Sequence, residues 1–162
     1  MVPAVSRLPR LRGFDYRGRH AYFLTFCTYK RKATLDDASV AAMVIEQILQ
    51  AARRFEFDVL AYCLMPDHVH LLVHGRSDRS DLRRFVKRTK QSSGQIHVRT
   101  AKEPLWQDSY YDHVVRPEEN LAGIGCYISQ NPVRARLVAS ALDYPFSGSS
   151  VWSIEELVGL LD

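Results

Sequence analysis

The two histidines of the segment His68-Val69-His70 are the residues in this sequence best suited to binding a metal ion. In an extended strand, residues two apart point to the same face, so both imidazoles would converge while Val69 and Leu71 face the core. Two neutral imidazole nitrogens leave most of the coordination shell of a divalent ion open to water, a third protein ligand and a substrate oxygen. Alone, such a pair also occurs as a structural or surface feature.

A second candidate for chemistry is the segment Tyr127-Ile128-Ser129-Gln130-Asn131. The spacing i, i+4 places the Tyr127 phenol and the Asn131 amide on one helical face, where one could act as a nucleophile and the other could complete a metal site. Tyrosine is a weak nucleophile, with an ordinary pKa of about 10, but it can form a phosphate ester when a metal polarises the phosphoryl oxygen. The alternatives are a packing role for Tyr127 and a helix end at Asn131, since the residue before a proline avoids helical geometry.

Strands and helices must bring these two segments together, and the sequence contains signals for both. Runs rich in aromatic and β-branched residues predict strands, and apolar residues at helical spacing after a capping residue predict helices. The predicted elements are, in order, a strand over 20–29, a helix from a cap at Asp36 or Asp37 to about residue 55, strands over 58–64 and 68–74, a helix opening at Asp78 or Ser80, a strand over 112–116, a helix from 117 to about 130, and a short helix near 154–161.

Met65-Pro66-Asp67 supplies turn chemistry, so the strands over 58–64 and 68–74 should form an antiparallel hairpin. The order β-α-β-β-α-β-α matches the ferredoxin-like arrangement. We therefore predict an α+β fold in which a four-stranded antiparallel sheet carries its helices on one face. A chain of 162 residues fits one ordinary domain. We divide it into a basic N-terminal tail (1–13), a catalytic domain (14–140) and a C-terminal tail with a short helix (141–162). No apolar run approaches the roughly 20 residues of a membrane span, and no signal core is evident, so we expect a cytoplasmic protein.

The net charge of +4 hides a strong segregation of basic residues. Residues 1–32 and residues 76–102 each carry a net charge of +7, whereas the remainder of the chain carries −10. A segregated positive field suits a polyanion such as DNA or RNA. The alternative is a solvated helix face together with a basic tail.

Taken together, these motifs resemble the single-tyrosine HUH transposases, and in particular the branch of REP-associated tyrosine transposases. The resemblance covers about residues 14–150. It rests on the segments Phe23-Leu24-Thr25-Phe26-Cys27-Thr28, Met65-Pro66-Asp67-His68-Val69-His70-Leu71-Leu72-Val73, Trp106-Gln107, Tyr110-Tyr111-Asp112-His113-Val114-Val115-Arg116 and Tyr127-Ile128-Ser129-Gln130-Asn131-Pro132-Val133-Arg134-Ala135.

The resemblance implies a metal-dependent endonuclease and strand transferase that acts on single-stranded DNA. His68, His70 and Asn131 would be the metal ligands, and Tyr127 the nucleophile that forms a 5′-phosphotyrosine and frees a 3′-OH. The metal would be Mg²⁺ or Mn²⁺, because imidazole ligands favour Mn²⁺ whereas abundance favours Mg²⁺. Such proteins occur as homodimers and as monomers, and either state is compatible with this sequence.

The expected DNA partner is a hairpin of REP type with a short unpaired flank, and its contacts would weaken as salt rises. The side chains expected to contact its phosphates are Arg10, Arg12, Arg17, Arg19, Arg83, Arg84, Lys87, Arg88 and Lys90. Exposed aromatic side chains near the site would stack on unpaired bases.

Two other functions remain open on the sequence. The first is a hairpin-binding module of the same fold without catalysis. The second is a zinc hydrolase or deaminase, against which stands the lack of an H-x-E with P-C-x-x-C and of an H-E-x-x-H. Tyr110 and Tyr111 are alternative nucleophiles, although neither has an Asn or Gln four residues later. His74 is a candidate for supporting the metal site, and His113 for positioning DNA.

Overall fold

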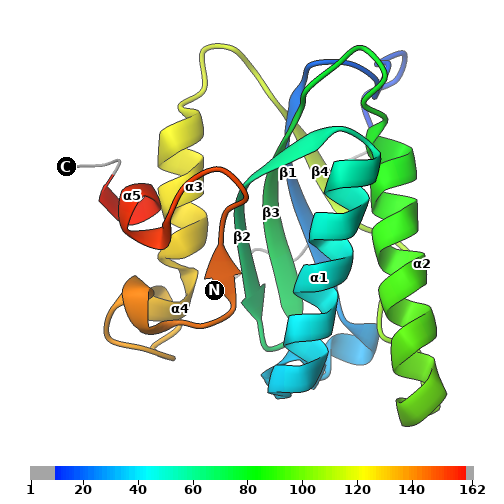
Figure 1. The fold of residues 1–162 in the computed structure, drawn as a ribbon, viewed down its shortest axis with the longest axis vertical. Helices are drawn as coiled ribbons and strands as arrows, with labels where there is room; N and C mark the ends of the chain where they lie inside the picture. Colours follow the sequence, from blue (N-terminus) through cyan, green and yellow to red (C-terminus); the bar gives the residue numbers. More distant parts are fainter. Residues whose placement is uncertain (1–9, 160–162) are drawn as a thin grey trace.

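A five-stranded antiparallel sheet forms the centre of the molecule in the computed structural model, which describes residues 10–159 (Figure 1). The strands lie side by side in the order β4-β1-β3-β2-β5. Their bounds are Ala21–Cys27 for β1, Phe57–Met65 for β2, His68–Gly75 for β3, Tyr111–Val115 for β4 and Ser147–Gly148 for the short β5. The predicted α+β class is confirmed, with one strand more than expected. The predicted antiparallel hairpin of β2 and β3 is also confirmed.

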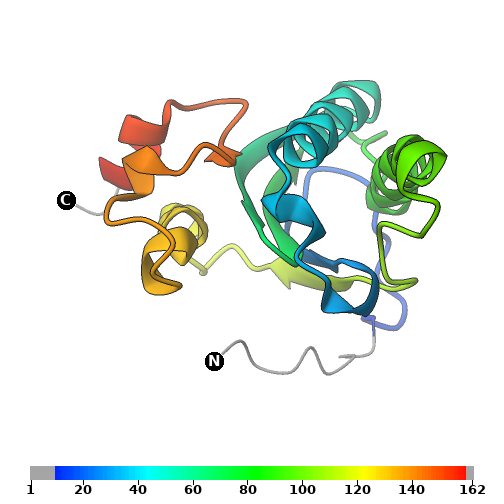
Figure 2. The same ribbon diagram turned by 90° about the horizontal axis from the view of Figure 1, so that it is seen from below.

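Two long helices, α1 (Ala38–Arg54) and α2 (Leu82–Ala101), cover one face of the sheet (Figure 2). Asp37 begins α1 by accepting hydrogen bonds from the next residues' amides, as one of the two predicted caps. The cap of α2 is Asp81, and not Asp78 or Ser80 as predicted. Ser80 is fully buried and its hydroxyl donates to the Glu56 carbonyl, so it does not cap α2.

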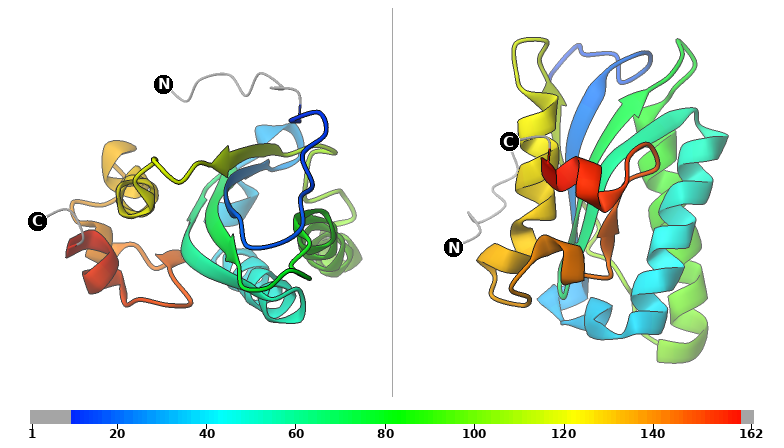
Figure 3. Two further views of the ribbon diagram at one scale, coloured as in Figure 1. Left: turned by 90° about the horizontal axis from the view of Figure 1, so that it is seen from above. Right: turned by 60° about the vertical axis from the view of Figure 1, so that its left-hand side comes forward.

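The opposite face of the sheet is covered by three shorter helices, so the prediction that the helices share one face is wrong (Figures 2 and 3). They are α3 (Leu121–Ser129), α4 (Asn131–Arg134) and α5 (Ile154–Gly159). The strands bear apolar side chains on both faces, and Ala61, Cys63 and Leu72 would be exposed without this second layer. Among the helices of residues 10–159, none is both long and apolar enough to span a membrane.

Helix α3 lies close to β2 and β3 because Gly125 has no side chain. A Cβ atom at Gly125 would lie 3.9 Å from the Ala61 Cβ and 4.0 Å from a Leu72 methyl, and only 3.2 Å from a methyl of Leu157 on α5. Ile128, one turn further along, is fully buried against the same apolar cluster. The sheet carrying the histidine pair therefore packs directly against the helix carrying Tyr127.

The third predicted helix begins later than expected, at Leu121 and not at Pro117. The Glu119 carboxylate accepts a hydrogen bond from the Arg116 amide and pairs with His113, so residues 116–119 form a turn. The predicted end near Gln130 is confirmed, but the chain continues into the short α4, in which Pro132 occupies a first-turn position that tolerates proline.

The C-terminal segment packs on the sheet. β5 pairs with β2, the Tyr144 hydroxyl donates to the Leu64 carbonyl at 2.6 Å, and Leu157 of α5 is fully buried. Of the predicted N-terminal tail, residues 1–9 lie outside the described residues.

Candidate active site

His68 and His70 point to the same face of β3, as strand alternation predicts. Their rings meet edge to face with centroids 4.7 Å apart, and the two residues are 5% and 7% exposed. Val69, between them, points into the core under α1 and α2. The imidazoles therefore lie on the side of the sheet that α3 covers.

The Nδ1 atom of each histidine has a partner that fixes the ring. Thr25 Oγ1 lies 3.0 Å from His70 Nδ1, and Asp67 Oδ1 lies 2.6 Å from His68 Nδ1. Asp67 is itself held by the Arg31 guanidinium at 2.9 Å. Among the described residues, neither Nε2 atom has a hydrogen-bond partner. This arrangement, with one ring nitrogen held and the other available, is the one found in histidines that bind metals.

The pKa shifts of His70 and Asp67 suit a neutral metal ligand and an ionised carboxylate that supports the site. Burial lowers the pKa of His70 to about 3, with smaller electrostatic contributions from His68, Arg134 and Arg31. His70 is therefore uncharged near neutral pH, as metal binding requires. Burial alone would raise the pKa of the Asp67 carboxyl, but the hydrogen bonds from His68 and Arg31 lower it below its ordinary value.

Tyr127 lies near the end of α3 and Asn131 at the start of α4. Arg134 contacts both residues. The Arg134 guanidinium lies 3.9 Å from the centroid of the Tyr127 ring. It also donates to the Tyr127 backbone carbonyl at 2.6 Å and to Asn131 Oδ1 at 2.9 Å. Tyr127 is 53% exposed, so its phenol is accessible to a large substrate.

Asn131 Nδ2 is buried and has no hydrogen-bond partner among the described residues. A buried donor without a partner is costly, so this NH₂ group favours an acceptor such as a water or phosphate oxygen. The atom of Asn131 that could ligate a metal is Oδ1, which accepts from Arg134. No cluster of three or more His, Cys, Asp or Glu side chains able to hold a metal occurs within residues 10–159. The donors available here are thus two imidazoles and one amide, a set that fits Mg²⁺ or Mn²⁺ when water or phosphate oxygens supply the remaining ligands.

The alternative tyrosines lie on different faces of the sheet. Tyr110 packs with Phe26 on the face of the sheet that α2 covers, which is opposite to the face of the histidines. Burial raises the pKa of its phenol. Tyr111 pairs in register with Thr25 and contacts the edge of Phe23, so it lies on the histidine face. It is therefore the competing nucleophile that experiments must separate from Tyr127.

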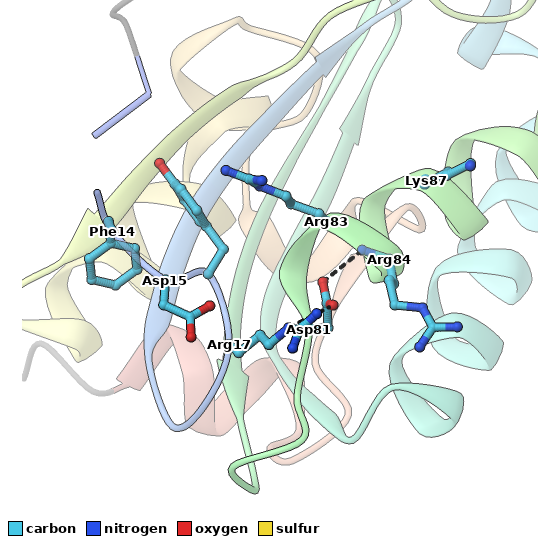
Figure 4. Close-up of a pocket in the computed structure, with 8 residues that line it drawn as sticks. Phe14, Asp15, Arg17, Asp81, Arg83, Arg84 and Lys87 are labelled. Carbon is cyan, nitrogen blue, oxygen red and sulfur yellow. Dashed lines mark hydrogen bonds and ion pairs between the residues drawn. The ribbon is translucent and has the colours of Figure 1, made fainter. Parts of the chain in front are cut away.

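The basic side chains of α2 lie near the start of β1, on the opposite side of the sheet from the two histidines. Arg17, Arg83, Arg84 and Lys87 surround a cavity of about 280 Å³, with Asp81 between them (Figure 4). Arg17 pairs with Asp81 at 3.4 Å, and the Arg83 guanidinium lies 5.1 Å from the Tyr16 ring centroid. The side chains around this cavity are more basic than acidic, which suits an anionic ligand.

The remaining predicted DNA contacts lie in varied settings. Arg10 pairs with Asp112 at 3.8 Å, and Arg19 pairs with Asp78 at the same distance. Arg12 and Arg88 are exposed. Lys90 differs from them, because its ammonium donates to the carbonyls of Gln107 and Ser109 and burial lowers its pKa to about 8.

Sequence reasoning missed three residues that support the site. Thr25 contacts His70 from a strand 45 positions away, so no local pattern reveals it. Arg134 lies seven residues after Tyr127 and three after Asn131, a helical spacing that could have been noticed. The turn chemistry of Asp67 does not predict its contact with His68, although a carboxylate next to a candidate ligand is a common supporting group.

Known proteins resemble this chain in sequence and in fold. The family model described as "Transposase IS200 like" matches residues 17–131. A candidate REP-associated tyrosine transposase of Haemophilus influenzae is 28% identical over 109 residues, which cover 60% of this chain and 62% of the relative. The REP-associated tyrosine transposase of Escherichia coli K12 is 27% identical over 108 residues, which cover 65% of this chain and 62% of the relative. The matches span less than two thirds of either relative.

A solved structure of a REP-associated tyrosine transposase bound to a REP hairpin has the same fold, with a TM-score of 0.70 and 22% identity. The match covers 86% of this chain and 82% of that one. Because the family model covers most of the chain, including both histidines, Tyr127 and Asn131, this protein belongs to the IS200-like transposase family.

Proposed function

We propose that this protein is a metal-dependent endonuclease and strand transferase for single-stranded DNA, with Tyr127 as its nucleophile. The observation that carries the proposal is the contact between two layers. The sheet holds two imidazoles with their Nδ1 atoms fixed, α3 packs on it and bears Tyr127, and α4, which follows directly, begins at Asn131. His68, His70 and Asn131 would hold Mg²⁺ or Mn²⁺. When bound, this ion would supply Lewis-acid polarisation of a phosphate oxygen.

The reaction would exchange one phosphate ester for another. The Tyr127 hydroxyl loses its proton to solvent and its oxygen attacks the phosphorus. The bond from phosphorus to the 3′ oxygen breaks, and that oxygen takes up a proton from solvent and leaves as a 3′-OH. The DNA 5′ phosphate is then esterified to Tyr127. Attack by another 3′-OH reverses these bond changes and joins strands, so no external energy source is needed.

Arg134 supports this reaction as a positioning residue. Its guanidinium touches the Tyr127 ring, the Tyr127 carbonyl and the Asn131 side chain, and so fixes the nucleophile relative to the third ligand. Its positive charge also lies near the place where a phosphate would bind, since it contributes to lowering the pKa of His70, although burial contributes most.

The partner that we propose is hairpin DNA with an unpaired flank. A solved relative of the same fold is bound to a REP hairpin, and the basic cavity of α2 in this chain offers phosphate ligands. That cavity and the histidines lie on opposite faces of the sheet. A bound hairpin would therefore contact α2 while its flank passes round the β4 edge to Tyr127.

A covalent-adduct assay tests this function. A hairpin oligonucleotide labelled at its 3′ end is incubated with the protein and Mn²⁺, and products are separated under denaturing conditions. Because a 5′-phosphotyrosine retains the 3′ fragment, wild type should give a labelled protein band, and EDTA should abolish it. Tyr127→Phe should lose the band and Tyr111→Phe should keep it. Hairpin binding without any band, across varied flank sequences, would favour the alternative of a non-catalytic DNA-binding module.

A further inference from the structure

A cavity of about 450 Å³ opens beside Tyr127, between α3 and the β1-β4 edge of the sheet. Its lining includes Phe23, His113, Glu119, Asn120, Ile124 and Tyr127. The Phe23 ring stacks on His70, with centroids 5.5 Å apart and an interplanar angle of 21°. The cavity is therefore next to both parts of the candidate active site.

The cavity combines apolar walls with a few polar groups at its edge. Phe23 and Ile124 supply flat or apolar surface, and His113 pairs with Glu119 at 2.8 Å. The ionised Glu119 carboxylate can only accept, so His113 Nε2 donates to it, and Nδ1 is left as the other hydrogen-bonding atom of the ring. Among the described residues, Nδ1 has no partner.

Asn120 adds a group that can both donate and accept. It is exposed, it precedes α3, and its side chain makes no capping hydrogen bond. Its amide lies against Gly123, where a Cβ atom would come within 3.1 Å of Asn120 Nδ2. The missing side chain at Gly123 thus leaves room for the amide beside the cavity.

We propose that this cavity binds one unpaired nucleobase, adjacent to the phosphate that Tyr127 attacks, and so contributes to the choice of cleavage sequence. The position of the scissile phosphate rests on the proposed function, whereas the binding of a base does not. An aromatic surface with polar groups at its rim suits a planar base with a hydrogen-bonding edge. Because Tyr127 forms one wall, the bound base belongs to a nucleotide next to its target.

Base binding can be measured without catalysis. In Tyr127→Phe, which keeps the ring but cannot form the ester, hairpin oligonucleotides carrying 2-aminopurine at single flank positions serve as the probe. Stacking in the cavity should quench the fluorescence at one position. Phe23→Leu should remove the quenching and weaken binding of the flank about tenfold. Unchanged fluorescence at every flank position of a bound hairpin would overturn the proposal.

Sequence choice gives an independent test that leaves Phe23 and His70 intact. Wild type and Asn120→Asp are offered hairpins with randomised flanks, and the covalently captured strands are sequenced. Since Asp accepts but does not donate, the variant should select bases that bear an exocyclic amino group and disfavour thymine at one position. Gln50→Glu, the same chemical change on α1, should keep the wild-type preference.

The two tests separate the cavity from the reaction. One outcome is that wild type captures DNA, Asn120→Asp shows the same base preference, and no flank position is quenched. This outcome would reject base binding in the cavity and leave the proposed function standing. Quenching that depends on Phe23, with no capture by wild type, would support the cavity and reject the proposed function.

Discussion

The Arg134 guanidinium lies 3.9 Å from the centroid of the Tyr127 ring and at the same time donates a hydrogen bond of 2.9 Å to Asn131 Oδ1. One exposed side chain thus links the candidate nucleophile to the candidate third ligand. Replacing it should leave folding intact but disturb the alignment of these two groups.

We predict that Arg134→Gln forms the covalent DNA adduct at least about tenfold more slowly than wild type, since small losses of alignment are costly in catalysis. The measurement is the rate of adduct formation at saturating hairpin and Mn²⁺. Arg136→Gln is the matched control, because Arg136 is also exposed but has no hydrogen bond to Tyr127 or Asn131. Equal rates in the two variants would argue against a positioning role for Arg134.

The contacts that hold the two imidazole Nδ1 atoms predict an effect on metal affinity. Thr25→Val leaves His70 Nδ1 without its partner at 3.0 Å, and Asp67→Asn weakens the contact to His68. Groups that hold metal-binding histidines typically contribute 10- to 100-fold to affinity. We expect each variant to bind Mn²⁺ at least about tenfold more weakly in calorimetric titration. Wild-type affinity in both would mean that these contacts do not serve a metal site.

These two contacts also show where sequence reasoning stops. The order of the elements and the β2-β3 hairpin followed from local patterns, since Pro66 and Asp67 carry their own turn chemistry. The second helix layer did not, because the strands are apolar on both faces and periodicity does not reveal which helix covers which face. Thr25 meets His70 only through the register of β1 and β3, a relation between distant segments.

The close packing of α3 on the sheet predicts a stability difference between two glycines. Gly125→Val should lower the free energy of unfolding by about 1–3 kcal/mol, because the new side chain would press on Leu157 and Ala61. Gly94→Val on α2 is the control, since the nearest atom to its Cβ position lies 3.9 Å away. Denaturant unfolding monitored by circular dichroism compares them. A loss at Gly94 as large as that at Gly125 would contradict this packing.

Lys90 predicts a pH dependence of stability. Burial lowers its pKa from 10.5 to about 8 in the folded chain, so between these pH values the unfolded chain binds more protons. Stability therefore rises with pH across this window. We expect a gain of about 1 kcal/mol from pH 8 to 9.5, allowing for the partial exposure of the side chain. Lys90→Met should lack this gain in urea unfolding, whereas a parallel pH profile would show that Lys90 is not buried as described.

Lys90 also differs from its neighbours in its expected contribution to DNA binding. Its ammonium is already bound to the Gln107 and Ser109 carbonyls, whereas Lys87 is exposed beside the basic cavity. Lys87→Gln should weaken hairpin binding and reduce its salt dependence by about one counterion, and Lys90→Gln should do so less. Titrations of a labelled hairpin at several salt concentrations compare the two, and a larger effect at Lys90 would reverse this assignment.

The central claim is that Tyr127 becomes covalently joined to DNA. The most direct measurement is to isolate the adduct formed by wild type with hairpin DNA and Mn²⁺, digest the protein with a protease and the DNA with a nuclease, and locate the nucleotide by mass spectrometry. We predict a 5′-linked nucleotide on Tyr127. A nucleotide on Tyr111 or on any other residue would contradict the account.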